Sequence, residues 1–245
     1  MDAAAYQALR DLQDEHWWFV GRRRIIRELI AAHVPLGPDA AILEAGCGYG
    51  GNLPLLREFG RVSAFEYDGE ARAFAARASG IAVAPGALPD RLDLGGQRFD
   101  LIAMLDVLEH IEEDNASLSR LGEHLTPGGR MVITVPAFAW LWSRHDEVHH
   151  HKRRYSRASL KAALARAGLK PVKTGYFNTL LFPLALVQRL ASRLRSGETA
   201  AETLPPAPLN KALTAVFGSE SWAATRWPLP FGLSLFAVAE RAEQA

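Results

Sequence analysis

The chain has 245 residues, and 49% of them are hydrophobic, which is enough for one full α/β core rather than two independent domains. Its 28 basic and 27 acidic side chains nearly balance, so no nucleic-acid partner is expected. The single cysteine, Cys47, cannot form a disulfide within the chain, and the charged N-terminus lacks the apolar stretch of a signal peptide. These features predict a cytoplasmic protein.

Residues 1–40 are predicted to form a helical arm ahead of the first strand. Apolar residues recur there at helical spacing and predict one buried stripe: Ile25, Ile26, Leu29 and Ile30. Arg22 precedes this stripe by three or four residues, so we expect its guanidinium on the inward face, with Arg23 as the alternative. Trp17, Trp18 and Phe19 either pack as a hydrophobic latch or close over a bound ligand.

Strands and helices alternate beyond this arm. The expected strands are 41–45, 61–66, 81–84, 99–105, 130–135, 171–177 and 233–239, and the expected helices are 52–59, 69–79 and 113–125, with a further helix from Ser156 to Gly168. Such alternation predicts an α/β fold, with a parallel sheet covered by helices on both faces. We expect a single domain, 1–245, in which 41–177 is the ligand-binding core and 231–245 holds the last strand and a tail.

The segment 42–52 reads as an apolar strand that turns through glycines into a helix. Residues without side chains let the backbone approach a nucleotide-like ligand and place helix N–H groups beneath it. Gly46, Gly48 and Gly51 match the dinucleotide pattern G-x-G-x-x-G, which is a weak signal. Glu44 favours another ligand, because a carboxylate beside the turn attracts a cation such as the amino group of S-adenosylmethionine.

A second acidic side chain is expected at the end of the next strand. Glu66 lies twenty residues after Gly46, about where a carboxylate should meet ribose hydroxyls. Asp68 competes for this role, but it directly precedes an alanine-rich helix and is a good N-cap. We therefore assign the ribose contact to Glu66 and the cap to Asp68. Asn52 is likewise expected to cap the helix that follows the glycine turn.

The pattern E-x-G-x-G-x-G, from Glu44 to Gly50, resembles the first motif of class I S-adenosylmethionine-dependent methyltransferases. Segments 99–111, 125–129 and 131–136 are similar to later motifs of the same superfamily, in the same order. The block 105–111 looks most like the type 11/12-like branch that includes ubiquinone-biosynthesis O-methyltransferases. The resemblance implies a Rossmann-like, seven-stranded, mostly parallel sheet with a final antiparallel edge strand, and S-adenosylmethionine as cofactor.

The resemblance also implies where the cofactor should bind. Many relatives have an acidic residue near Ala87 or Leu88 that meets the adenine amino group. This sequence has none there, so we expect backbone groups, or less favourably Asp90, to meet the adenine, with Leu88 against the ring. An inward Arg22 would pair with the methionine carboxylate. The expected cofactor-binding residues are Glu44, Gly46, Cys47, Gly48, Gly50, Asn52, Glu66, Tyr67, Leu88, Leu105, Arg22 and Trp18.

Imidazoles and carboxylates are concentrated in the segment 145–150, after the expected fifth strand. His145 and His149 would share one face of a helix. Either could be a general base that deprotonates an acceptor hydroxyl, since imidazole titrates near neutral pH. The segment could instead be a structural or positioning cluster. A metal site of His145, Asp146 and His149 or His150 ranks last, so no metal is assigned.

Three further polar residues follow the strand 99–105. Asp106 ends that strand facing the expected site, and we include it with His145 and His149 as a candidate catalytic residue. Glu109 and His110 are weaker candidates, because they could simply orient the helix that follows.

The connection 178–230 is far longer than an ordinary loop. Its first half is apolar with basic residues at Arg189, Arg193 and Arg195, its middle 196–209 is a linker, and Leu209 to Phe217 is a second helical piece. We interpret it as a lid-like insert beside the acceptor pocket. An apolar segment with a basic edge also suits a hydrophobic or lipid-linked acceptor, or peripheral contact with a membrane.

These observations predict a methyltransferase that acts on a small-molecule acceptor, at oxygen in our interpretation. Two alternatives stay open. One is an NAD(P)-dependent oxidoreductase, and the other is a non-catalytic protein that binds S-adenosylmethionine. The sequence does not name the acceptor.

Overall fold

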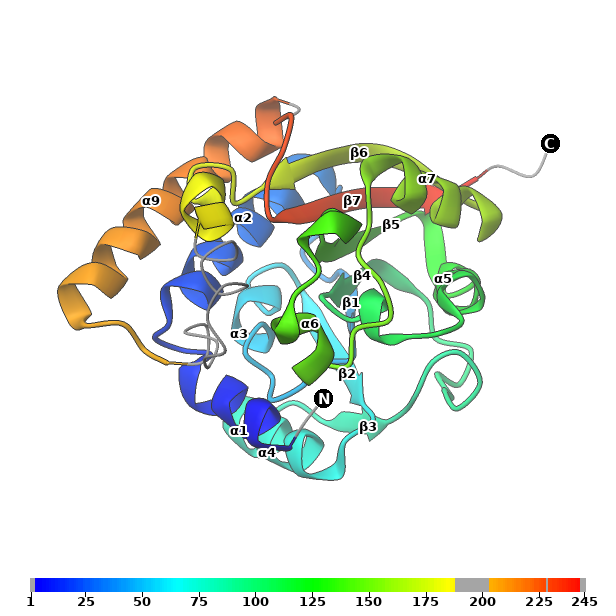
Figure 1. Cartoon of the computed structure of the whole chain (residues 1–245). Helices are drawn as coiled ribbons and strands as arrows, with labels where there is room; N and C mark the ends of the chain where they lie inside the picture. Colours follow the sequence, from blue (N-terminus) through cyan, green and yellow to red (C-terminus); the bar gives the residue numbers. More distant parts are fainter. Residues whose placement is uncertain (1–2, 188–202, 228, 243–245) are drawn as a thin grey trace.

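The computed structural model describes residues 3–187, 203–227 and 229–242. The strands of this part form one seven-stranded sheet in the order β3-β2-β1-β4-β5-β7-β6 (Figure 1). Their bounds are β1 Ala41–Ala45, β2 Arg61–Glu66, β3 Val83–Pro85, β4 Phe99–Leu105, β5 Leu125–Pro136, β6 Leu169–Phe177 and β7 Ser234–Arg241. The predicted α/β, Rossmann-like fold is confirmed.

The position of the last strand differs from the prediction. Strand β7 is antiparallel as expected, but it lies between β5 and β6, and β6 forms the edge of the sheet. Leu235 to Ala239 are all fully buried in β7, whereas β6 carries an exposed lysine, Lys170, and a proline, Pro171. Proline and exposed lysine suit an edge strand, because an edge needs fewer backbone donors and has to resist pairing with other chains.

The helices are α1 Ala3–Leu12, α2 Trp17–His33, α3 Leu53–Leu56, α4 Gly69–Ser79, α5 Asp114–Gly122, α6 Arg144–Val148, α7 Arg157–Arg166 and α9 Ala207–Arg226, with single 3-10 turns η1 Leu108–His110 and η2 Ala139–Leu141. Residues 182–187 are also helical. The helix expected at 52–59 is limited to α3. Within the described residues, no helix has the length and apolar character needed to cross a bilayer.

Helices cover both faces of the sheet. On one face, Ile26 and Ile30 of α2 pack with Ile42 and Val132 of the sheet. On the other face, residues of α5 and α7 pack against the same strands, among them Leu118 and Leu164. The predicted apolar stripe of α2 is confirmed, because Ile25, Ile26, Leu29 and Ile30 are all fully buried. The predicted cofactor site lies at the carboxyl ends of β1, β2 and β4.

The second half of the 178–230 connection is part of the core. Helix α9 is longer than the predicted piece and packs against α2, where Phe217 is fully buried (Figure 1). A Cβ at Gly21 of α2 would lie 2.5 Å from the Phe217 ring, so only glycine allows the two helices to approach this closely. Arg189, Arg193, Arg195 and the first half of the expected linker lie outside the described residues.

Candidate functional site

The turn after β1 needs glycine at three alternate positions. Gly46, Gly48 and Gly50 have φ angles of +72°, +55° and +84°, a region that side chains disfavour. Gly51, the third glycine of the dinucleotide pattern, has no such conformation. The backbone therefore follows the E-x-G-x-G-x-G reading of the segment rather than the G-x-G-x-x-G reading.

Glu44 lies beneath this turn and is 1% exposed. Its Oε1 accepts a hydrogen bond of 2.9 Å from Asn52 Nδ2, and its Oε2 is buried with no hydrogen-bond partner among the described residues. Burial raises the pKa of Glu44 to about 7. Asn52 was expected to cap α3, but its side chain makes no cap bond and binds Glu44 instead. A buried acceptor without a donor fits the cationic amino group of S-adenosylmethionine.

Glu66 ends β2 and holds the glycine turn. Its carboxylate accepts the N–H groups of Gly48 and Asp68, each at 2.8 Å. Asp68 caps α4 through a bond of 2.9 Å to Ala71 N, so the predicted capping role of Asp68 is confirmed. Tyr6 of α1 also hydrogen-bonds Glu66, which places the N-terminal helix over the turn. Nothing in the sequence pattern had indicated Tyr6.

Arg22 points inward from α2 as predicted, but its partner lies within the protein. Its guanidinium forms an ion pair of 2.5 Å with Asp106 and donates to Thr134 Oγ1 at 3.2 Å. The same guanidinium lies over the Trp18 ring, 5.0 Å from its centroid. Arg22 is engaged with Asp106, but its Nε is buried with no hydrogen-bond partner among the described residues, so its contact with the methionine carboxylate of the cofactor stays a prediction. Arg23, the alternative, donates to a backbone carbonyl of the arm at Gln13.

The other expected cofactor residues differ in exposure. Cys47 is buried within the turn, and burial raises the pKa of its thiol, which suits a small packing side chain. Leu88 packs on the main core, and Leu105 is buried at the end of β4. Tyr67 is 67% exposed with Arg91 over its ring. The structure brings these four residues to the ends of the strands without showing a contact with ligand.

The structure brings the predicted histidine pair together. The rings of His145 and His149 have centroids 4.0 Å apart, at α6 and its C-cap. Burial is the main cause that lowers the pKa of His145, to about 3, and the neighbouring imidazoles add to it. The imidazole of His145 therefore stays neutral throughout the usual pH range. This pKa lies below the ordinary histidine range on which the sequence argument relied, and the role of His145 as a base stays a prediction.

Asp146 is held by several hydrogen bonds within the protein. It is fully buried, and burial alone would raise its pKa, but hydrogen bonds from His151 and Arg154 outweigh this and hold the pKa below its ordinary value. The distances are 2.8 Å to His151 Nδ1 and 2.7 Å to Arg154 Nε, and Ser143 N donates to the second oxygen. The lowest-ranked alternative, a metal set of His145, Asp146 and His149 or His150, differs from the group of possible ligands that lies together among the described residues.

Glu109 and His110 lie closer to the site than the sequence indicated. Glu109 is 1% exposed, and burial, followed by the charge of Asp106, raises its pKa well above the ordinary value. Burial also lowers the pKa of His110 to about 3. The His110 and His151 rings have centroids 4.7 Å apart. Sequence analysis missed His151 and Arg154, although both stand in the basic run that follows His145.

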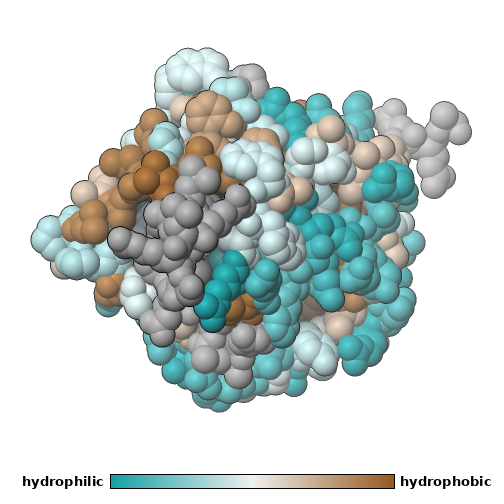
Figure 2. All heavy atoms as spheres, viewed as in Figure 1, coloured by the Kyte–Doolittle hydropathy of each residue, from teal (hydrophilic) through white to brown (hydrophobic). Residues whose placement is uncertain are grey.

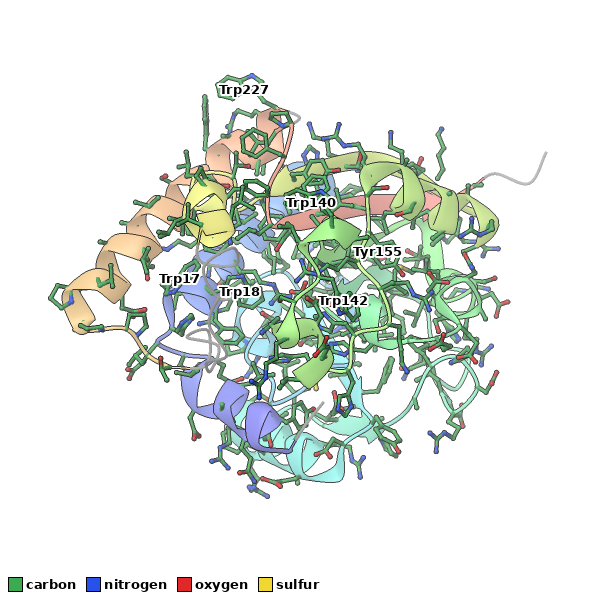
Figure 3. All side chains as sticks on the ribbon, viewed as in Figure 1. Trp17, Trp18, Trp140, Trp142, Tyr155 and Trp227 are labelled. Atoms are coloured by element: carbon green, nitrogen blue, oxygen red, sulfur yellow. The ribbon has the colours of Figure 1, made fainter. Side chains whose placement is uncertain are left out.

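Aromatic side chains surround this region. In Figure 3, Trp17 and Trp18 come from the start of α2, Trp140 and Trp142 come from the segment after β5, and Trp227 projects from the end of α9. Trp17 contacts Phe217 edge-on, with centroids 5.7 Å apart. This contact belongs to the core between α2 and α9, as the latch interpretation proposed.

The fold and the residues around the glycine turn define a class of protein. A seven-stranded sheet with an antiparallel β7, a turn with three left-handed glycines, and acidic residues ending β1 and β2 are the features of class I S-adenosylmethionine-dependent methyltransferases. The profile of a family described as "Methyltransferase domain" matches residues 19–174, more than half of the chain, and the protein belongs to this family. The family and the cofactor predicted from the sequence are confirmed.

Two curated proteins share part of their length with this chain. One from Mycolicibacterium smegmatis, named as an S-adenosylmethionine-dependent methyltransferase, is 28% identical over 163 residues, 65% of this chain and 62% of that protein. Trans-aconitate 2-methyltransferase of Deinococcus radiodurans is 29% identical over 142 residues, 56% of this chain and 51% of that protein. The chain thus spans less than two thirds of either relative.

A solved structure shares the fold over nearly the whole chain. Magnesium protoporphyrin IX methyltransferase from Synechocystis PCC 6803, with bound SAH, aligns over 98% of this chain and 96% of its own. The TM-score is 0.61 and the identity is 14%. At this identity the likeness concerns the fold and not the acceptor.

Proposed function

We propose that this protein transfers the methyl group of S-adenosylmethionine to an oxygen atom of a small-molecule acceptor. The observation that carries the proposal is the pair of carboxylates at the ends of neighbouring strands. The unpartnered, buried Oε2 of Glu44 suits the amino group of the cofactor. Glu66 keeps lone pairs for ribose hydroxyls after accepting two backbone N–H groups. Tyr67 and Leu88 lie along the same edge, where the adenine would bind.

The acceptor side of the proposal rests on the two neighbouring imidazoles of His145 and His149. Methyl transfer from the sulfonium breaks a carbon–sulfur bond and forms a carbon–oxygen bond, while the acceptor hydroxyl gives up its proton. A neutral, buried imidazole can accept a hydrogen bond from such a hydroxyl and take its proton. His145 and His149 are the candidates, and Asp106 at the end of β4 is the third. The enzyme needs mainly to align the reactants and to exclude water. Positioning should therefore account for most of the rate enhancement.

An apolar surface beside the site supports a hydrophobic acceptor. Leu180, Leu184 and Val187, at the start of the 178–230 connection, are between 57% and 64% exposed. Phe182 contacts the rings of Trp140 and Phe231. Figure 2 shows hydrophobic side chains gathered over α9 and the neighbouring segment 182–187. Exposed apolar groups of this kind are typical of surfaces that bind apolar ligands, partners or lipid.

Calorimetric titration tests the cofactor half of the proposal. Wild-type protein should bind S-adenosylmethionine and S-adenosylhomocysteine but not NADH, and Glu44→Gln should bind S-adenosylmethionine more weakly. Binding of NADH alone would favour the oxidoreductase instead. Turnover is tested by S-adenosylhomocysteine formation on a cell extract, with mass spectrometry to find the methylated product. Tight binding of S-adenosylmethionine without turnover on any extract would favour a non-catalytic binding protein.

A further inference from the structure

Three side chains beside the cofactor cradle lie close enough together to hold a cation. Glu109, His110 and His151 each offer a ligand atom within 4.8 Å of the others, among the residues that the structure describes. Glu109 and His110 belong to η1, directly after β4, whereas His151 comes from the segment after α6. Lys152 N donates to the Glu109 carbonyl at 2.7 Å and holds the two segments together.

Each of the two imidazoles is oriented by a hydrogen bond through one of its nitrogens. His151 Nδ1 lies 2.8 Å from Asp146 Oδ1, and Asp146 is kept ionised by Arg154. The His110 ring hydrogen-bonds the backbone of His149. A nitrogen that donates to an oxygen carries the proton, so the second nitrogen is the one that each ring would offer to a metal ion. Metal-binding histidines almost always have this outer hydrogen bond to a carboxylate, a carbonyl or water.

Glu109 provides a further reason for a cation. Its carboxyl group is buried, and Oε2 has no hydrogen-bond partner among the described residues. A buried carboxylate without a partner is costly unless a positive charge or a metal ion compensates it. The charges of Arg22 and Arg154 act on Glu109, but Arg22 is paired with Asp106 and Arg154 with Asp146. A divalent ion would supply both the charge and the missing contact.

We propose that Glu109, His110 and His151 bind a divalent transition-metal ion, with Zn²⁺ as the representative. Two imidazoles and one carboxylate suit zinc, iron, cobalt or nickel, whereas Mg²⁺ and Ca²⁺ prefer oxygen ligands. Three protein ligands leave a coordination position open for water or for an acceptor atom. The ion would join the turn after β4 to the segment after α6, at the same edge of the sheet as the cofactor cradle. This proposal does not depend on methyl transfer.

The test uses full-length protein without a histidine tag, stripped with a chelator and titrated with Co²⁺. We expect about one equivalent to bind, with visible ligand-field absorption that Zn²⁺ removes and a large excess of Mg²⁺ does not. Glu109→Gln and His151→Ala should each weaken binding by at least ~100-fold, since even outer-shell changes cost ~10–100-fold. His150→Ala, which removes an exposed neighbouring imidazole, should bind like wild type.

Thermal unfolding separates loss of the site from loss of the fold. Glu109→Gln removes a buried carboxyl while keeping its shape, so the metal-free variant should be at least as stable as metal-free wild type. Zn²⁺ should raise the Tm of wild type and of His150→Ala but not that of Glu109→Gln. The proposal is overturned if wild type gives no Co²⁺ spectrum, if Mg²⁺ displaces Co²⁺, or if Glu109→Gln and His151→Ala bind as tightly as wild type.

Discussion

The Arg22 guanidinium lies 2.5 Å from the Asp106 carboxylate and joins the N-terminal arm to the end of β4. Arg22 is 4% exposed, and Asp106 has a φ of +57°, which a non-glycine residue adopts only when its surroundings hold it there. Thr134 and the Trp18 ring also contact the guanidinium. The arm is therefore fixed to the carboxyl edge of the sheet by charge as well as by its apolar stripe.

Removing one partner of this ion pair should destabilise the protein strongly. Arg22→Met leaves Asp106 without its cation and should lower the free energy of unfolding by about 3–5 kcal/mol. Arg27→Met is the matched control. The side chains of Arg27 and Glu58 are 41% and 47% exposed, so their ion pair should contribute less than about 1 kcal/mol to stability. Urea unfolding measures both changes. Equal effects of the two variants would contradict a structural role for the buried pair.

Cofactor affinity should depend on Glu66 and not on Asp68. Glu66→Ala removes the acceptor for Gly48 N and for the ribose hydroxyls, so we expect S-adenosylmethionine binding to weaken roughly tenfold or more. Asp68→Ala removes the N-cap of α4 and should cost ~1 kcal/mol of stability, with affinity near wild type. Calorimetry and urea unfolding measure the two quantities. Loss of binding only in Asp68→Ala would reverse the assignment.

The raised pKa of Glu44 predicts a particular pH dependence of stability. Its pKa rises from 4.5 to about 7 on folding, so the folded state binds the proton more tightly. The resulting stabilisation is fully present below about pH 4.5 and is lost as pH rises through 7, roughly 3 kcal/mol in total. Glu44→Gln does not titrate. The difference in unfolding free energy, wild type minus variant, should therefore fall from pH 4.5 to about pH 8; a constant difference would contradict the raised pKa.

Bound cofactor should lower the raised pKa of Glu44. Its amino group favours the ionised carboxylate, so binding to wild type should strengthen as pH rises through about 7. Calorimetry in Glu44→Gln should show weaker binding without that rise. The same pH profile in both proteins would place the amino group elsewhere.

The histidine pair should affect turnover without a histidine-like pH profile. His145→Gln should lower kcat while the Kd for S-adenosylmethionine stays near wild type, if the imidazole acts on the acceptor. Because the pKa of His145 is about 3, the wild-type rate should show no step from this group between about pH 5 and pH 8. Glu147→Gln, an exposed change on the same helix, is the control. A cofactor affinity that falls together with kcat would indicate a structural cluster instead.

The exposed apolar surface can be tested with vesicles. Replacing Leu180, Leu184 and Val187 together by Gln leaves the core intact, because all three are exposed, whereas Leu181 is buried and stays unchanged. Turnover of a hydrophobic acceptor should fall while S-adenosylmethionine binding is kept. Co-sedimentation of wild type with vesicles containing anionic lipid should be lost in the variant. No sedimentation of wild type, with activity only on polar acceptors, would remove the lipid interpretation.

The sequence by itself determined the fold class and the cofactor. Local patterns carry this information: the alternation of strands and helices, the glycines between Glu44 and Asn52, and Glu66 at the next strand end. Left-handed turns and the two-residue period of strands are properties of neighbouring residues, so they can be read along the chain. Even the edge position of β6 was signalled by Pro171, although the sequence analysis assigned the edge to the last strand.

Only the tertiary structure decided which polar groups meet. Arg22 pairs with Asp106, 84 positions further on, and the ring of His151 offers a ligand atom close to those of Glu109 and His110. Burial then set the pKa values, so that Glu44 and His145 titrate far from their ordinary ranges. Partner choice and desolvation depend on packing between distant segments, and a local pattern contains neither. For the same reason the sequence could indicate a helix at 209–217, but only the structure shows that α9 packs against α2.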